Sequence, residues 1–311
     1  MTTQEDLLDD GFIEYALYET PDDGQLHTLN IPPTEEQRRT ITDRGRNKDY
    51  VIQTRLHTCI HGTLDGHIPS SLIVFEYRVK FNKERRAFST VRTSFSFTKS
   101  KNPHSDKTPF VPGHGIEVKA FAPFQNYVQY HETTAEETRE RGGKATLGTP
   151  SELPVQASLE GSGSDTSKHT QRYFDEGYAG TRHDEERNLD NAVEWYLHHN
   201  ESQGDGVSPI FRVAILLKRE DSELFYGHFV ITVEGGIRFA IADTLRSFMM
   251  APDDPIIFNP ARKPLWNGSE VSDPKTIGVD PSKLGELANG DMLDGLTMVW
   301  GLEPLKKKTG K

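Results

Sequence analysis

Cysteine is almost absent from this chain, because Cys59 is the only one among 311 residues. A single thiol can form neither an intrachain disulfide nor a zinc site made of cysteine pairs, and such usage is typical of a reducing compartment. The sequence from Met1 to Asp6 has no basic stretch and no apolar run, so we expect no secretory signal. We therefore expect a protein that is not secreted and lies in the cytoplasm, with the nucleus as the alternative.

Apolar residues are also scarce, at 34% of the chain. No stretch approaches the roughly 18 consecutive apolar residues of a membrane-spanning helix, so the chain is not expected to span a membrane. The formal net charge of -11 disfavours nonspecific nucleic-acid binding by the molecule as a whole. At roughly 100 to 200 residues per domain, the length favours two domains, with one large β domain as the alternative.

What the sequence does contain is period-two alternation of apolar and polar residues. It runs through residues 72–98 on both sides of a short polar break, and it returns in residues 211–233. Such alternation predicts two β-hairpins, each with one buried face. Further strands are expected at 50–60, 116–121, 127–130, 193–197 and 296–300, and short helices after Thr34 and at 244–250. We predict a mainly β protein of two antiparallel sandwich-like domains with few short helices.

Composition indicates where the domains begin and end. The first 23 residues contain eight acidic side chains and no Lys or Arg, and a stretch near the middle is poor in apolar residues and rich in Gly, Ser and Thr. We divide the chain into an acidic peripheral arm (1–48), a first β domain (49–135), a Gly/Ser/Thr-rich linker (136–169), a second β domain (170–302) and a basic tail (303–311).

Four short stretches of the sequence resemble stretches of a known group of proteins. Residues 71–77 (SLIVFEY), 200–204 (NESQG), 211–219 (FRVAILLKR) and 254–258 (DPIIF) are similar to those of a group of uncharacterised proteins from filamentous fungi. The resemblance covers about residues 70–300, and it implies a eukaryotic, intracellular, β-rich protein. It implies no activity, so it assigns no catalytic residue to this chain.

The densest cluster of possible metal ligands is His57, Cys59 and His61, followed by Asp65 and His67. On a regular strand, residues 57, 59 and 61 point to one face, where two imidazoles and a thiolate would bind a transition metal with His67 or Asp65 as the fourth ligand. The alternative is a half-buried strand end with ordinary polar side chains. No other cofactor is predicted.

A basic stretch within residues 78–107 is the candidate anion-binding surface. Its side chains would grip single-stranded nucleic acid or anionic lipid if the interleaved aromatic residues were exposed. The aromatic residues fall on the alternating apolar face, however, so docking of the acidic arm or simple solvation is the alternative. The candidate residues are Arg78, Lys80, Lys83, Arg85, Arg86 and Arg92.

Aromatic residues of the second half are candidates for a ligand cleft between the two domains, with packing in the core as the alternative. Trp195 and Trp266 are the main candidates, and the same set also contains Trp300, Tyr173, Phe174, Tyr178 and Tyr196. There is no Gly-x-Ser-x-Gly elbow and no signature around the single thiol, so the sequence favours a protein that is not an enzyme.

Three functions remain open from the sequence. The first is a non-enzymatic interaction or self-assembly protein, with a second copy of itself as the expected partner. The second is a small-ligand- or metal-binding protein, or an enzyme, with an inter-domain pocket. The third is a membrane-active protein that acts through residues 145–159, where Ala145 and Leu147, and then Val155, Ala157 and Leu159, stand at alternate positions.

Overall fold

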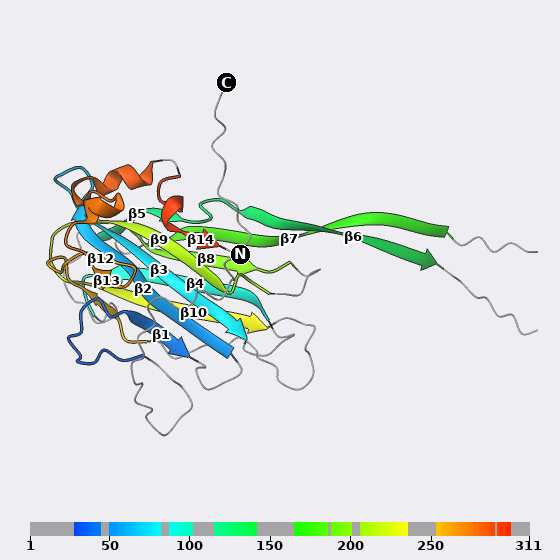
Figure 1. Cartoon of the computed structure of the whole chain (residues 1–311), viewed down its shortest axis with the longest axis horizontal. Helices are drawn as coiled ribbons and strands as arrows, with labels where there is room; N and C mark the ends of the chain where they lie inside the picture. The colour runs from blue at the N-terminus through cyan, green and yellow to red at the C-terminus, as the bar shows by residue number, and fades with distance from the viewer. Residues whose placement is uncertain are drawn as a thin grey trace, which may run out of the picture.

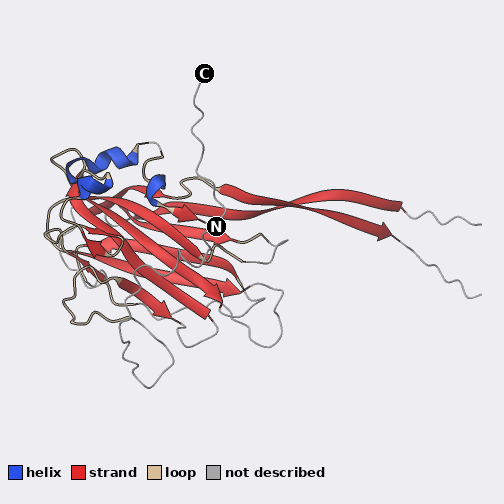
Figure 2. Cartoon of the chain, in the orientation of Figure 1, coloured by secondary structure: helices blue, strands red, loops and turns tan. Residues whose placement is uncertain are grey.

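The chain folds into two antiparallel β-sheets that pack face to face, as Figures 1 and 2 show. This computed structural model describes residues 28–44, 50–81, 87–101, 115–141, 165–185, 188–200, 206–235, 253–289 and 291–299. The expected fold class, mainly β with antiparallel sandwich-like packing and few short helices, is confirmed.

The larger sheet, sheet B, has the strand order β13-β12-β2-β3-β9-β14, with β1 also pairing with β2 and β5 with β9. Its strands are β1 (Thr40–Arg44), β2 (Tyr50–Thr63), β3 (Pro69–Phe81), β5 (Ile116–Ala122), β9 (Ile210–Arg219), β12 (Leu265–Trp266), β13 (Ser269–Glu270) and β14 (Met298–Val299). Sheet A has the order β11-β10-β4-β8-β7-β6. Its strands are β4 (Phe88–Thr98), β6 (Val128–Arg141), β7 (Asp165–Asp184), β8 (Leu189–His198), β10 (Phe225–Gly235) and β11 (Ile256–Phe258).

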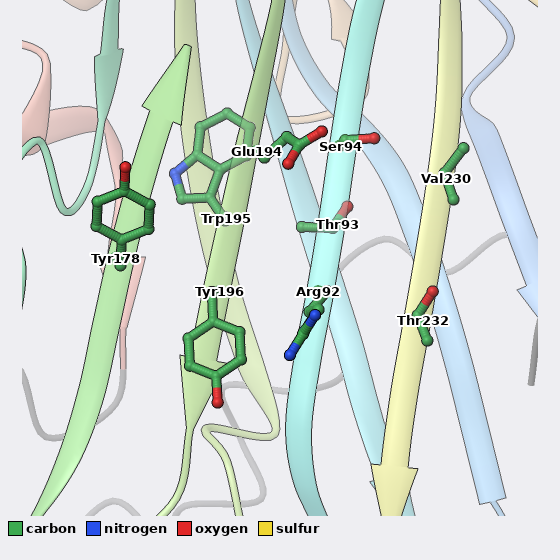
Figure 3. A pocket seen from close by; sticks show the side chains of 9 residues that line it. All are labelled: Arg92, Thr93, Ser94, Tyr178, Glu194, Trp195, Tyr196, Val230 and Thr232. Carbon is green, nitrogen blue, oxygen red and sulfur yellow. The ribbon is translucent and has the colours of Figure 1, made fainter. Parts of the chain in front are cut away.

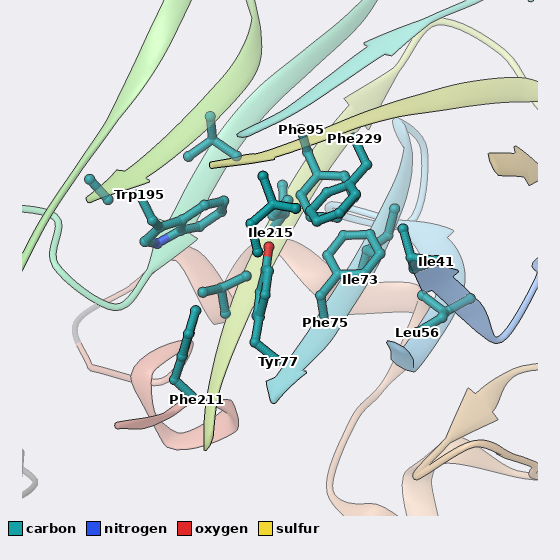
Figure 4. Packing of buried hydrophobic residues seen from close by; sticks show 14 of the residues in the cluster. Ile41, Leu56, Ile73, Phe75, Tyr77, Phe95, Trp195, Phe211, Ile215 and Phe229 are labelled. Carbon is teal, nitrogen blue, oxygen red and sulfur yellow. The ribbon is translucent and has the colours of Figure 1, made fainter. Parts of the chain in front are cut away.

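The two expected hairpins are not hairpins. Strand β3 lies in sheet B and β4 in sheet A, and β9 and β10 divide between the sheets in the same way. The apolar faces that the alternation predicts are present, but they face each other across the sandwich instead of lying side by side in one sheet. The rings of Phe75 on β3 and Phe95 on β4 stack with centroids 3.7 Å apart, and Figure 4 shows them at the centre of the core.

Both sheets take strands from both halves of the chain. Strand β3 pairs with β9 in the register Leu72↔Leu216, and β4 lies between β8 and β10. A division into two separately paired domains on either side of residues 136–169 does not agree with this topology. The expected linker also begins and ends within strands, because β6 continues to Arg141 and β7 starts at Asp165.

The described part of the expected peripheral arm, residues 28–44, is built into the sandwich. Its strand β1 pairs with β2, and the buried guanidinium of Arg38 donates hydrogen bonds to the side chain of Asn30 and to the carbonyl of Asp254. Arg44 forms a buried ion pair of 3.2 Å with Asp253. The contacts with Asp253 and Asp254 join chain segments more than 200 residues apart, which no local pattern predicts. No helix follows Thr34, and residues 1–27 lie outside the described part.

Three short 3-10 helices cover the outer face of sheet B: η3 (Pro274–Ile277), η4 (Pro281–Ala288) and η5 (Asp294–Leu296). A second apolar cluster fills the space between, including Leu284 and Leu287 of η4 against Ile60 of β2. Helix η4 approaches β2 at Gly62, where an added Cβ atom would lie 1.9 Å from the Pro281 carbonyl oxygen. None of the helices in the described ranges is long and apolar enough to cross a membrane. The helix expected at 244–250 lies outside those ranges.

Candidate functional site

The four expected metal ligands are not brought together. The pairing of β2 with β3 passes from Leu56↔Phe75 to Thr58↔Val74, so His57 is an extra residue in a β-bulge. A bulge shifts the side-chain alternation by one position. His57 therefore lies on the outer face of sheet B, with its ring 5.9 Å from that of Trp266.

Cys59 and His61 instead face the core between the two sheets, and His67 is exposed in the turn after β2. Within the described residues, no group of three or more His, Cys, Asp or Glu side chains is arranged to hold a metal ion. The four side chains therefore do not converge on one site, and the bulge at His57 is the physical reason.

His61 belongs to a small buried polar cluster. Its Nε2 lies 2.7 Å from the side-chain nitrogen of Gln37 and 3.3 Å from Cys59 Sγ, and its Nδ1 lies 2.8 Å from Ser71 Oγ. Since the Gln37 nitrogen is a donor, Nε2 accepts and Nδ1 carries the proton. Burial, assisted by the charge of Arg219, lowers the pKa of His61 to about 3, and burial raises the pKa of Cys59. At neutral pH the imidazole is thus neutral and the thiol protonated, and a protonated thiol is neither a good metal ligand nor a nucleophile.

The buried histidines predict acid sensitivity. Burial, assisted by the charge of Arg212, lowers the pKa of His57 to about 4. In the unfolded chain both histidines titrate near pH ~6.5, so below that pH the unfolded state binds protons that the folded state does not. The free energy of unfolding should be fully retained above pH ~6.5 and should fall as the pH drops toward 4, by about 1.4 kcal/mol per pH unit for each histidine.

Urea unfolding between pH ~6 and ~5 measures this slope, and comparison with a histidine variant cancels the contribution of the carboxylates, which begin to titrate at the lower end of this range. The variant His61→Gln should show a slope smaller by about 1.4 kcal/mol per pH unit, whatever its stability at neutral pH. An unchanged slope would contradict the assignment of His61 as a buried neutral group.

The expected basic surface does not form on one face. Arg78 and Lys80 follow each other on the outer face of sheet B, where Arg78 lies 3.9 Å from Glu76. Arg92 lies on the outer face of sheet A, with its guanidinium 5.1 Å from the ring centroid of Tyr196. The cause is the division of β3 and β4 between the two sheets. Lys83, Arg85 and Arg86, like the acidic residues 1–23 proposed to dock on them, lie outside the described residues.

The two tryptophans do not line one cleft. Trp195 points into the core from β8, is 1% exposed, and donates its indole N–H to the Pro123 carbonyl at 3.2 Å. Trp266 belongs to sheet B and packs against the apolar cluster beneath the 3-10 helices. The two indoles therefore lie apart, Trp195 on the inner face of sheet A and Trp266 on the outer face of sheet B.

The most unusual feature of the molecule is a two-stranded ribbon formed by β6 and β7. The two strands pair from Val128↔Gly177 to Arg141↔Asp165, whereas β8 pairs with β7 only from Glu176 onward. In Figure 1 the ribbon extends well beyond the sandwich. Within the part of the chain that the structure describes, residues 134–141 and 165–172 pair with each other and with no further strand. We call these residues the distal ribbon.

The distal ribbon exposes strand edges without offering an apolar face. Ala135 is the single apolar residue in its sequence. Isolated two-stranded ribbons are marginally stable in water, and an open strand edge is a template for pairing with another chain. The sequence gives little sign of this element, because polar residues on both faces leave no alternation to detect.

A second candidate site lies on the outer face of sheet A. A shallow hollow of ≈ 260 Å³ crosses β7, β8, β4 and β10, as Figure 3 shows. Tyr178, Tyr196, Arg92, Glu194 and Val230 are among the residues that line it. Tyr178 and Tyr196 were grouped with the tryptophans as cleft residues in the sequence, but they meet on an open sheet face. The alternation in β8 is the signal that places Tyr196 there, opposite the inward Trp195.

No protein-family model matches the sequence, and no curated protein matches it. Among solved structures, the chain is similar to the Clostridium perfringens NetB toxin in its membrane-inserted form, with 9% sequence identity over 60% of this chain and 78% of that chain, and a TM-score of 0.22. A TM-score of 0.22 is too low to indicate a shared fold or function.

Proposed function

We propose that this protein is a non-enzymatic, self-assembling β protein whose copies join through the edges of the distal ribbon. The observation that carries the proposal is the ribbon itself, a paired segment that leaves the sandwich and has an open edge on each side in the described residues. The enclosure of Cys59 in the core supports a role without chemistry, because Cys59 is the chain's single thiol and burial raises its pKa.

The geometry of the ribbon favours a second copy of the same chain as the partner. The β6 edge and the β7 edge lie on opposite sides of the ribbon and have the same length, because their residues pair one to one from Thr134↔Arg172 to Arg141↔Asp165. The β6 edge of one copy can therefore pair with the β7 edge of the next, and each added copy leaves the same two edges open. Such head-to-tail association ends when the array closes, which removes all open edges.

The charges of the two distal strands also favour this arrangement. Residues 134–141 contain three Glu and two Arg, which gives -1, whereas residues 165–172 contain one Asp, one Lys and one Arg, which gives +1 with His169 neutral. Net charges of opposite sign in the two sequences favour a β6 strand next to a β7 strand over two β6 strands side by side, which supports the head-to-tail arrangement.

Sedimentation velocity of the intact chain over a range of concentrations tests the proposal. We expect a discrete species heavier than the monomer that grows with concentration, since edge pairing follows mass action. Sedimentation as a monomer at every concentration would contradict the proposal.

A membrane-active function is a second candidate, favoured by the position of one segment. Residues 145–159 lie outside the described residues, but the chain that contains them connects Arg141 to Asp165, which pair at the far end of the ribbon. Residues at alternate positions of a strand share one face, so the alternating apolar residues of this segment would give a strand one apolar face. Replacing residues 142–164 with Asn-Gly should then abolish dye release from liposomes that the intact chain permeabilises. Absence of dye release by the intact chain would reject this candidate.

A further inference from the structure

The residues around Tyr178 form a platform on the outer face of sheet A. Gly180 lies two residues after Tyr178 on β7. A Cβ atom added at Gly180 would lie 2.8 Å from the Tyr178 hydroxyl oxygen. The absence of a side chain at Gly180 lets the tyrosine ring lie along the sheet, and Figure 3 shows the ring from its face. Tyr178 is 51% exposed, so an apolar ring face is presented to solvent.

Polar side chains lie beside this platform on the neighbouring strands of sheet A. Tyr178 pairs with Tyr196 on β8, which pairs with Arg92 on β4. The Arg92 guanidinium is held 5.1 Å from the Tyr196 ring centroid, an arrangement that fixes the direction of its donors. Glu194, two residues before Tyr196 on β8, accepts a hydrogen bond of 2.9 Å from Arg182. The hollow therefore combines one apolar face with guanidinium donors and a carboxylate acceptor.

This combination matches the chemistry of a sugar ring. A pyranose has an apolar face of C–H groups and a rim of hydroxyls, each both donor and acceptor, and binding sites join apolar contact with a few directed polar groups. Val230, 54% exposed, extends the apolar contact at the other side of the hollow. The open volume of ≈ 260 Å³ suits a chain that lies across the sheet rather than a small molecule that must be enclosed.

Nucleic acid is the competing ligand for a surface with arginine and tyrosine. Its binding depends mainly on neutralising phosphates, and this chain has a net charge of -11 with Arg92 as the single arginine lining the hollow, while the neighbouring Arg182 is paired with Glu194. The charge balance thus favours a neutral ligand.

We propose that the hollow binds a neutral glycan through one hexopyranose unit, which stacks on Tyr178 while Arg92 and Glu194 contact its hydroxyls. The inference is independent of the assembly proposed above, because every residue of the hollow lies on the part of sheet A outside the distal ribbon. If copies do assemble, repeated hollows would add avidity for a polymeric glycan.

Binding of the intact chain to an array of neutral and acidic oligosaccharides and short single-stranded oligonucleotides tests the proposal. The strongest glycan is then titrated by calorimetry against point variants. We expect a neutral oligosaccharide to bind, Tyr178→Ala to weaken binding by about tenfold, and Tyr178→Phe to stay within about threefold of the intact chain. Gly180→Ala should also weaken binding, because its Cβ displaces the ring.

Tyr127→Ala is the matched control, since Tyr127 is 55% exposed and does not line the hollow. Its binding should be unchanged, and circular dichroism should show that all variants retain the β fold. The proposal is overturned if no oligosaccharide binds, if only oligonucleotides bind, or if Tyr178→Ala binds the glycan as tightly as Tyr127→Ala.

Discussion

Replacement of Phe95 by alanine should lower the free energy of unfolding by about 3–5 kcal/mol, the range of buried aromatic truncations. Phe95 is fully buried on β4 and stacks on Phe75 of the opposite sheet, with Phe229 4.8 Å away on the neighbouring strand. The lost ring therefore opens a cavity between the two sheets that rigid strands on both sides cannot close. Urea unfolding monitored by circular dichroism measures the change.

Val230→Ala is the control, because Val230 follows Phe229 on β10 but points to the solvent. Its effect should stay within about 0.5 kcal/mol. Equal effects of the two substitutions on the free energy of unfolding would contradict the face-to-face packing of the two sheets, since the inward and outward faces of sheet A would then be equivalent.

Removal of the distal ribbon should abolish assembly. In the variant that replaces residues 134–172 with Asn-Gly, Thr133 and Tyr173 are already paired, so a two-residue turn closes the shortened hairpin. The pairing of β7 with β8 from Glu176 onward is retained, so the unfolding midpoint should change little. Sedimentation should show a monomer at concentrations where the intact chain assembles.

The shorter replacement of residues 142–164 with Asn-Gly is the matched control, because Arg141 and Asp165 are paired and the distal ribbon stays complete. This variant should assemble like the intact chain. Loss of assembly in both variants would place the contact in residues 142–164, and assembly of the longer deletion would place it on the sandwich. Either result would contradict pairing through the ribbon.

The alternation in the sequence predicts which faces are buried but not what they are buried against. The alternation in residues 72–98 puts Phe75 and Phe95 on apolar faces, and both lie in the core, because period two alone fixes the face. Two alternating strands joined by a short polar break can form a hairpin within one sheet, or they can lie in two different sheets with the break crossing between them. Only the pairing of β3 with the distant β9 distinguishes them, and local sequence carries no information on that pairing.

The positions of the candidate site residues depend on structural details that the alternation of apolar and polar residues does not reveal. The bulge at His57 has no glycine or proline to mark it, so His57 was expected on the same face as Cys59 and His61. The ribbon was interpreted as a linker because its composition is polar, and its strands are recognised only by their pairing with each other. Conversely, the outward position of Tyr196 follows directly from the alternation in β8.

Hydrogen exchange at low and high protein concentration tests the central claim most directly. Backbone N–H groups on open strand edges exchange freely, and pairing with another chain protects them. We expect concentration-dependent protection of residues 134–141 and 165–172, with the protection of the sandwich strands unchanged. Equal exchange of the distal ribbon in the monomer and in the assembled protein would contradict assembly through its edges.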